Sequence, residues 1–320
     1  MSYITNDSAH SRQRSHSDRS GPPVDAPDGH LRVVAPTRTG TGPLPLPTMA
    51  RTAKKALEDL SQRGPHDVLH GDLALVGMPG VVCTPRSGRG LPAVAFGHAW
   101  LQPPRRYVGL LRHLASWGIV AAAPGTQGGA FASHRLLSSD LRSALDICTG
   151  VRLGEGAISV DQNRLGVAGH AMGGGCAVLA AAEDPRVRSV ATLAVAETLP
   201  SAFSAAARVS VPGLHVAAGK DLLAPAVSNA EPLAKAWGGP VQLRTAEKAS
   251  HLGFTEGRHW TELVLHGKPQ WATQRLSRAL LTAFFLRTLS GDQRGAALLD
   301  SDVSGCAIDH EHTRGALAAA

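Results

Sequence analysis

The sequence predicts an α/β protein with a mostly parallel central sheet and helices on both of its faces. Two observations support this fold class. Short apolar runs alternate with amphipathic stretches through most of the chain, which is typical of consecutive strand–helix units. The chain has 320 residues, 43% of them hydrophobic, so it can bury the full core that such a sheet needs.

The individual elements follow in order along the chain. Residues 67–85 predict two paired strands with a turn near Gly77, and they precede the parallel part of the sheet. Amphipathic spacing predicts helices over 105–118, 134–148 and 271–289. Short apolar runs predict six buried parallel strands: 92–96, 118–123, 164–169, 189–195, 213–218 and 241–245.

The two ends of the chain differ from this alternating part. Residues 1–48 are rich in Ser, Pro, Gly, His, Asp and Arg without hydrophobic periodicity, which predicts a disordered leader. Helical spacing starts near residue 50, and the expected α/β domain covers residues 49–291. Residues 292–320 are assigned to a C-terminal tail. Only 17 residues separate the strands that end at 195 and begin at 213, so no separate cap domain is expected.

Composition and charge exclude several function classes. The net charge of +7 comes mostly from arginine, with no long basic run and no aromatic residues among the basic ones, so no nucleic-acid partner is expected. The four cysteines form no CxxC pair, and no metal is expected. The first twenty residues lack the apolar segment of a signal peptide, and no apolar stretch reaches the roughly 18 residues of a membrane span. We therefore expect a cytoplasmic protein without a membrane partner.

A tight turn between a strand and a helix is the first feature that carries chemistry. In "VAGHAMGGG" (167–175) an apolar strand ends at Gly169, and alanine-rich helical spacing follows at once. Such a reversal strains the residue at its apex, Ala171, while Gly169 and Gly173 allow neighbouring backbone to approach. The N–H groups at the start of the helix then point at whatever binds there.

An acidic residue and a histidine follow this turn along the chain, and their order is informative. Asp221 comes directly after an apolar strand in "AAGKDLLAP", and His251 lies in a loop after the next strand in "EKASHLGF". Each residue also has a non-catalytic explanation: Asp221 could be a turn residue, and His251 could be a surface histidine. The order of apex, acid and histidine is that of the α/β-hydrolase triad, which favours a shared site.

Residues 62–290 resemble the α/β-hydrolases of the dienelactone hydrolase, chlorophyllase and cutinase-like polyester hydrolase group. The turn "GHAMGGG" matches the family's G-H-S-M-G-G-G, "GKDLLAP" matches the acid loop, and "ASH" matches the histidine loop. The segments "AFGHAWLQ" and "RGP" match the loop after an early strand and the start of the domain. The resemblance implies an α/β-hydrolase fold and, as partner, an ester, lactone or other acyl compound.

The resemblance also implies a role for each matching residue. Asp221 would orient and stabilise the histidine, and His251 would be the general base and acid. The oxyanion hole would comprise the backbone N–H of Met172 and that of His98 or Ala99. These groups suffice for acyl chemistry, so no cofactor is implied. Six side chains around the turn are candidates for the pocket: Trp100, Tyr107, Phe131, His170, Met172 and Phe203.

The chain departs from the family at the nucleophile position, where Ala171 stands in place of serine. A methyl group can neither attack an acyl carbon nor carry an acyl intermediate, so the chain as written should be inactive or nearly so. Cys176 is expected to be a core residue and not a substitute nucleophile.

Three interpretations of this departure stay open. The chain is an ester hydrolase whose serine has been replaced so that substrate is trapped, or a non-catalytic acyl-binding pseudoenzyme, with loss of function by drift as a further possibility. In the third interpretation, His251 and Asp221 act as a base without a covalent step.

Overall fold

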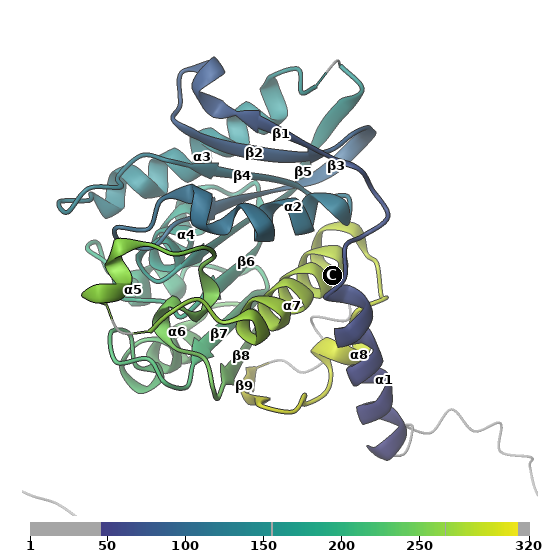
Figure 1. The fold of residues 1–320 in the computed structure, drawn as a ribbon, viewed down its shortest axis with the longest axis vertical. Coiled ribbons are helices and arrows are strands. Elements are labelled where there is room, and N and C mark those ends of the chain that lie inside the picture. Colours follow the sequence, from purple (N-terminus) through teal and green to yellow (C-terminus); the bar gives the residue numbers. More distant parts are fainter. Residues whose placement is uncertain (1–45, 155, 266, 313–320) are drawn as a thin grey trace, which may run out of the picture. The chain divides into compact units, whose positions relative to one another are not determined.

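The computed structural model describes residues 46–154, 156–265 and 267–312 (Figure 1). The predicted leader, residues 1–48, lies almost wholly outside the described residues. The described residues form a sheet with the strand order β1-β2-β4-β3-β5-β6-β7-β8-β9. Its strands are β1 (Val68–Asp72), β2 (Gly80–Pro85), β3 (Gly88–Gly97), β4 (Val120–Pro124), β5 (Ile158–His170), β6 (Val187–Leu193), β7 (Gly213–Ala218), β8 (Val241–Ala246) and β9 (Cys306–His312). The α-helices are α1 (Leu46–Leu60), α2 (Val108–Ser116), α3 (His134–Gly150), α4 (Met172–Glu183), α5 (Ala202–Ala206), α6 (Ala230–Ala236), α7 (Trp271–Ser290) and α8 (Ala296–Leu299).

The middle of the sheet is parallel, which confirms the predicted fold class. Strand β3 pairs in parallel with β4 and β5, and the parallel pairing continues through β6, β7 and β8. Every apolar run predicted to be a strand contributes to one of these six strands. The helices cross over between them, as parallel strands require.

The segment before the parallel strands forms the predicted antiparallel pair. Val68 of β1 is paired with Pro85 of β2, and a short 3-10 helix, Leu73–Val76, lies between the two strands. Gly77 ends this helix with φ 85°, in the left-handed region that glycine adopts without strain. Strand β2 then pairs antiparallel with β4 and joins the hairpin to the main sheet.

Two hydrophobic layers hold the helices on the faces of the sheet. One layer contains buried residues of α1, α2, α7 and α8, and the other contains buried residues of α3, α4, α5 and α6. Strand β3 shows how one strand serves both layers, because Val94 and Phe96 join the first and Ala93 and Ala95 join the second. The core therefore lies on both sides of the parallel strands, as the near-continuous apolar runs predict.

The C-terminal residues differ from the sequence-based expectation of a tail that begins at residue 292. Residues 306–312 form β9, which pairs antiparallel with β8 and extends the sheet. The buried side chain of Arg244 on β8 anchors this segment, since its Nη2 donates hydrogen bonds to the carbonyls of Leu298, Leu299 and Ser301 at 2.8–3.1 Å. The strand "CAIDHEH" has apolar residues only at its start, which is why periodicity did not predict it.

A separate observation concerns membranes. Among the helices of the described residues, none combines the length and the apolar character that crossing a bilayer would require.

Candidate active site

The turn at Ala171 has the strained geometry of a nucleophile elbow. Ala171 lies between β5 and α4 with φ 50° and ψ −117°, a backbone conformation that residues other than glycine rarely adopt. A Cβ atom added to Gly169 would lie 2.2 Å from the carbonyl oxygen of Gly173, and one added to Gly173 would lie 2.2 Å from that of Gly97. The glycines therefore allow β3, β5 and the start of α4 to approach one another around the apex.

Hydrogen bonds from three directions hold this strained residue. The N–H of Ala171 donates to the carbonyl of Leu193 at the end of β6 at 2.9 Å. Its carbonyl accepts from the N–H groups of Gly174, Gly175 and Ala196 at 3.0–3.2 Å. Strain of this kind costs on the order of 1–3 kcal/mol and persists only where the surroundings fix it. The apex is thus held in place by β6 and α4 together.

Asp221 and His251 form a buried hydrogen-bonded pair. Asp221 follows β7, His251 begins a 3-10 helix after β8, and the His251 Nδ1 lies 2.7 Å from the Asp221 Oδ2. The other carboxylate oxygen accepts from the N–H groups of Leu223 and Ala224 at 2.8 and 2.9 Å. The sequence-predicted acid and histidine are therefore in contact.

The surroundings of Asp221 keep its carboxyl group ionised. Burial alone would raise its pKa, but the hydrogen bond from His251 and the N–H groups of Ala224 and Leu223 outweigh burial and hold the pKa below its ordinary value. An ionised carboxylate only accepts, so the proton of the shared hydrogen bond belongs to the His251 Nδ1. With its proton at Nδ1, the His251 ring has Nε2 as the nitrogen that can accept a further proton, as a general base requires.

His170 places this pair beside the elbow. The ring centroids of His170 and His251 are 5.1 Å apart, and His170 directly precedes Ala171. His170 is fully buried, and burial lowers its pKa to about 3, so the ring stays neutral. Its Nδ1 lies 2.8 Å from the Tyr107 Oη. His170 therefore packs against His251 as a neutral ring.

The candidate oxyanion donors differ in their availability. The N–H of Ala99 donates to the Tyr107 Oη at 3.2 Å, so this donor already has an acceptor. At His98 the candidate is the backbone N–H and not the buried ring, whose two nitrogens lie against the carbonyl oxygens of Ala99 and Thr126 at 2.9 and 2.7 Å. No hydrogen bond of the described residues uses the N–H of Met172, the first residue of α4. Met172 thus presents a free donor at the positive end of a helix.

The residues predicted to line the pocket have different surroundings. His170, Met172 and Tyr107 are buried at or near the elbow, and Phe203 packs against the core. Trp100 is 42% exposed, and its Nε1 donates to the carbonyl of Ala130 at 3.0 Å. Phe131 is 100% exposed, so it forms no wall of a pocket in this structure. Sequence pattern places Phe131 in the right loop but cannot orient a side chain there.

None of the cysteines is suited to replace the missing serine. Cys83, Cys148, Cys176 and Cys306 are buried and free. Burial raises the pKa of Cys176 to about 12, so its thiol stays protonated at neutral pH and is a poor nucleophile. The expectation that Cys176 is a core residue is confirmed by its complete burial.

Arg106 forms a buried hydrogen-bond network that the sequence did not reveal. Its buried guanidinium donates to the Thr255 Oγ1 at 2.9 Å, to the Glu262 Oε1 at 3.0 Å and to the carbonyl of Glu256 at 3.0 Å. These acceptors lie in the segment that follows His251. Neighbouring Arg105 is exposed, and nothing in "PPRRY" distinguishes the two arginines.

The sheet topology together with the elbow, acid and histidine defines an α/β-hydrolase. A family model described as PET hydrolase-like matches residues 93–293, which is more than half of the chain. The chain therefore belongs to the PET hydrolase-like family, whose scaffold is that of an ester hydrolase. A search of curated proteins finds no match.

Proposed function

We propose that this chain binds carboxylic esters, lactones or related acyl compounds at the elbow and turns them over slowly or not at all. The observation that carries the proposal is the buried Asp221–His251 pair, with its 2.7 Å hydrogen bond, beside an elbow whose apex is Ala171. Family membership supports the ester as the ligand class. The methyl group at the apex supports the absence of a covalent step.

The backbone around the apex would still recognise an acyl group. The carbonyl oxygen of the ester would accept from the N–H of Met172 at the start of α4. The second donor we propose is the N–H of Trp100, because the N–H of Ala99 is bonded to Tyr107 and no hydrogen bond of the described residues uses that of Trp100. Polarisation without a nucleophile leaves on the order of 10³–10⁴-fold catalysis over water.

Exposed apolar side chains around the elbow indicate the kind of ester. Trp100 follows β3, Phe131 follows β4, Leu199 follows β6, Leu222 follows β7 and Leu263 follows β8. The carboxyl ends of parallel strands meet at one edge of a sheet, so these side chains share the edge that carries the elbow. We propose that the acyl or alcohol part of the ligand is apolar and extended, and the family description makes a polyester chain one candidate.

A second candidate function is base catalysis without a covalent intermediate. It is favoured by the ionised, buried Asp221, which fixes the His251 tautomer that can accept a proton at Nε2. In that case His251 would remove a proton from a water molecule that attacks the bound ester directly. Replacement of His251 by alanine would then remove the residual activity of the Ala171 protein.

The test compares the unaltered protein with the Ala171→Ser variant on short p-nitrophenyl esters and with a fluorophosphonate probe. We expect the serine variant to gain on the order of 10⁶ in kcat and to be labelled by the probe, since its Oγ can attack and pass its proton to His251. The control is Ala171→Ser combined with His251→Ala, which should lose the gain. Ordinary hydrolysis rates for the unaltered protein would refute the proposal. A serine variant that stays inactive and unlabelled would show that the oxyanion hole or the His251 geometry is not competent for catalysis, and would favour binding without turnover.

A further inference from the structure

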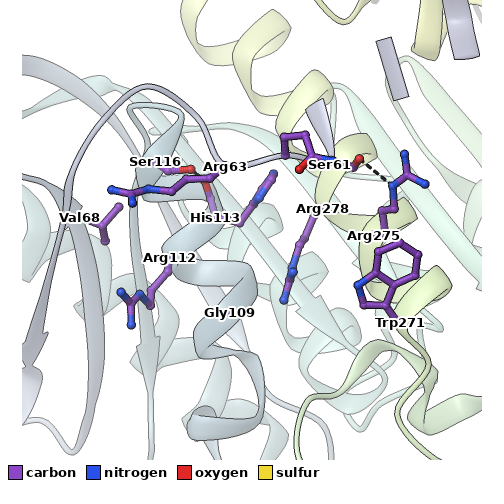
Figure 2. Close-up of a pocket in the computed structure, with 11 residues that line it drawn as sticks. Ser61, Arg63, Val68, Gly109, Arg112, His113, Ser116, Trp271, Arg275 and Arg278 are labelled. Atoms are coloured by element: carbon purple, nitrogen blue, oxygen red, sulfur yellow. Dashed lines mark hydrogen bonds between the residues drawn. The ribbon is translucent and has the colours of Figure 1, made fainter. Parts of the chain in front are cut away.

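A second concave site lies on the α1–α2–α7 face of the protein, outside the residues of the elbow. This pocket has a volume of about 520 Å³ (Figure 2). Gly109, Arg112, His113 and Ser116 of α2 form one wall, at the spacing of a single helix face. The other walls come from residues 61–63, which directly follow α1, from Val68 of β1 and from the first turns of α7.

Arginine side chains dominate the charge of this pocket. Arg63, Arg112, Arg275 and Arg278 all line it, and no Asp or Glu of the described residues does. In Figure 2, Arg63 and Arg112 lie on the Val68 side of α2, while Arg275 and Arg278 extend from α7 on its other side. The remaining ionisable lining residue is His113, whose pKa burial lowers to about 4, so it adds no charge at neutral pH.

Two of the four arginines have carboxylate partners. Arg63 pairs with Asp67 at 2.8 Å, and Arg278 pairs with Glu256 at 2.6 Å. Among the described residues Arg112 and Arg275 have no such partner. The Nε of Arg278 is buried without a hydrogen-bond partner in the described part of the chain. The pocket therefore has an excess of two positive charges and unsatisfied donors.

Neighbouring residues hold two of the guanidinium groups in place. The Nε of Arg275 donates to the Ser61 Oγ at 2.8 Å, and its guanidinium lies 5.6 Å above the Trp271 ring (Figure 2). A Cβ atom on Gly109 would lie 2.4 Å from the Glu256 Oε1 and 2.6 Å from the Arg278 Nη2, so glycine is what admits this ion pair against α2. Positioned guanidinium groups bind oxyanions better than freely rotating ones, because less side-chain entropy is lost.

We infer that this pocket binds a small dianion whose charge is carried by oxygen atoms, such as a phosphate group or a dicarboxylate. The two unpaired guanidinium groups give the pocket an excess of positive charge that attracts an anion, and their planar arrays of donors suit phosphate and carboxylate oxygens. The pocket is concave and lies between helices, which favours a small ligand over an extended polyanion. The inference is independent of the elbow and of the function proposed for it.

The test measures binding of inorganic phosphate, glycerol phosphate and succinate to the full chain by calorimetry, at constant ionic strength in sodium chloride. We expect saturable binding with one ligand per chain for at least one of them. Comparing the two phosphate ligands with succinate shows whether the pocket prefers a phosphate group or a dicarboxylate. The variant Arg112→Gln/Arg275→Gln should raise the Kd at least tenfold, because both unpaired charges are removed.

The matched control is Arg208→Gln, which removes an exposed arginine after α5, outside the residues that line the pocket. It should leave the Kd unchanged. Circular dichroism and the melting temperature establish that each variant is folded. The inference is refuted if none of the three anions binds saturably, or if the Arg112→Gln/Arg275→Gln variant binds as tightly as the unaltered protein.

Discussion

Replacing Gly173 by alanine tests how tightly the elbow is packed. The added Cβ would lie 2.2 Å from the carbonyl oxygen of Gly97, where real Cβ contacts are at least 3.0 Å. Two backbone segments would have to separate by about 0.8 Å, and neither can rotate away as a side chain could. Overpacking costs about 1–3 kcal/mol, and a contact between backbones belongs at the upper end of that range.

We therefore expect Gly173→Ala to lower the free energy of unfolding by about 3 kcal/mol, which for a domain of this size lowers the Tm by about 6–12 °C. Urea unfolding followed by tryptophan fluorescence measures the change. Gly150→Ala is the matched control, because an added Cβ at the exposed end of α3 meets nothing within 4 Å. That control should be neutral or stabilising by up to about 1 kcal/mol. If the free energy of unfolding of Gly173→Ala lies within about 1 kcal/mol of that of the unaltered protein, the close approach of Gly173 to Gly97 is wrong.

Three further outcomes are expected. In the Ala171→Ser background, Asp221→Asn should lower kcat by about 10⁴, because the amide no longer fixes the His251 tautomer; an unchanged kcat would exclude the pair from the chemistry. Burial holds the pKa values of His170 and His215 at about 3, below the value near 6.5 of an unfolded chain, so unfolding takes up protons. The free energy of unfolding should therefore be highest above pH 6.5 and fall as the pH drops toward 3, and urea titrations at several pH values would reveal a flat profile if this is wrong. Arg244→Met should leave several buried carbonyls without donors, lower the free energy of unfolding by about 3 kcal/mol or more, and speed proteolysis near β9; equal proteolysis rates would contradict this.

The parallel strands and the elbow were predictable because their signals are local. Runs such as "GIVAAA" report burial on both faces of a strand, and the spacing of Gly169, Ala171 and Gly173 reports a turn that only small residues permit. The close contact of Asp221 with His251 follows from topology, because residues after neighbouring parallel strands meet at one edge of the sheet.

What the sequence did not predict depends on side-chain reach across the fold. The Tyr107 hydroxyl accepts a hydrogen bond from the N–H of Ala99 and contacts His170, 63 residues further along the chain. No rule of sequence spacing predicts such a contact. The role of Arg106 likewise depends on acceptors about 150 residues away. Strand β9 was missed because four of its seven residues are charged or histidine, which periodicity assigns to solvent.

Strand β9 affects how readily copies of this protein could associate through the edge of the sheet. The match to the family model ends at residue 293, and β9 lies beyond it. Without β9, the backbone groups along one side of β8 would be free to pair with the edge of another sheet, a common route to aggregation. With it, the outermost strand carries Asp309 and Glu311, whose charges oppose strand addition. We therefore expect loss of residues 306–312 to expose the edge of β8 and to promote self-association through it.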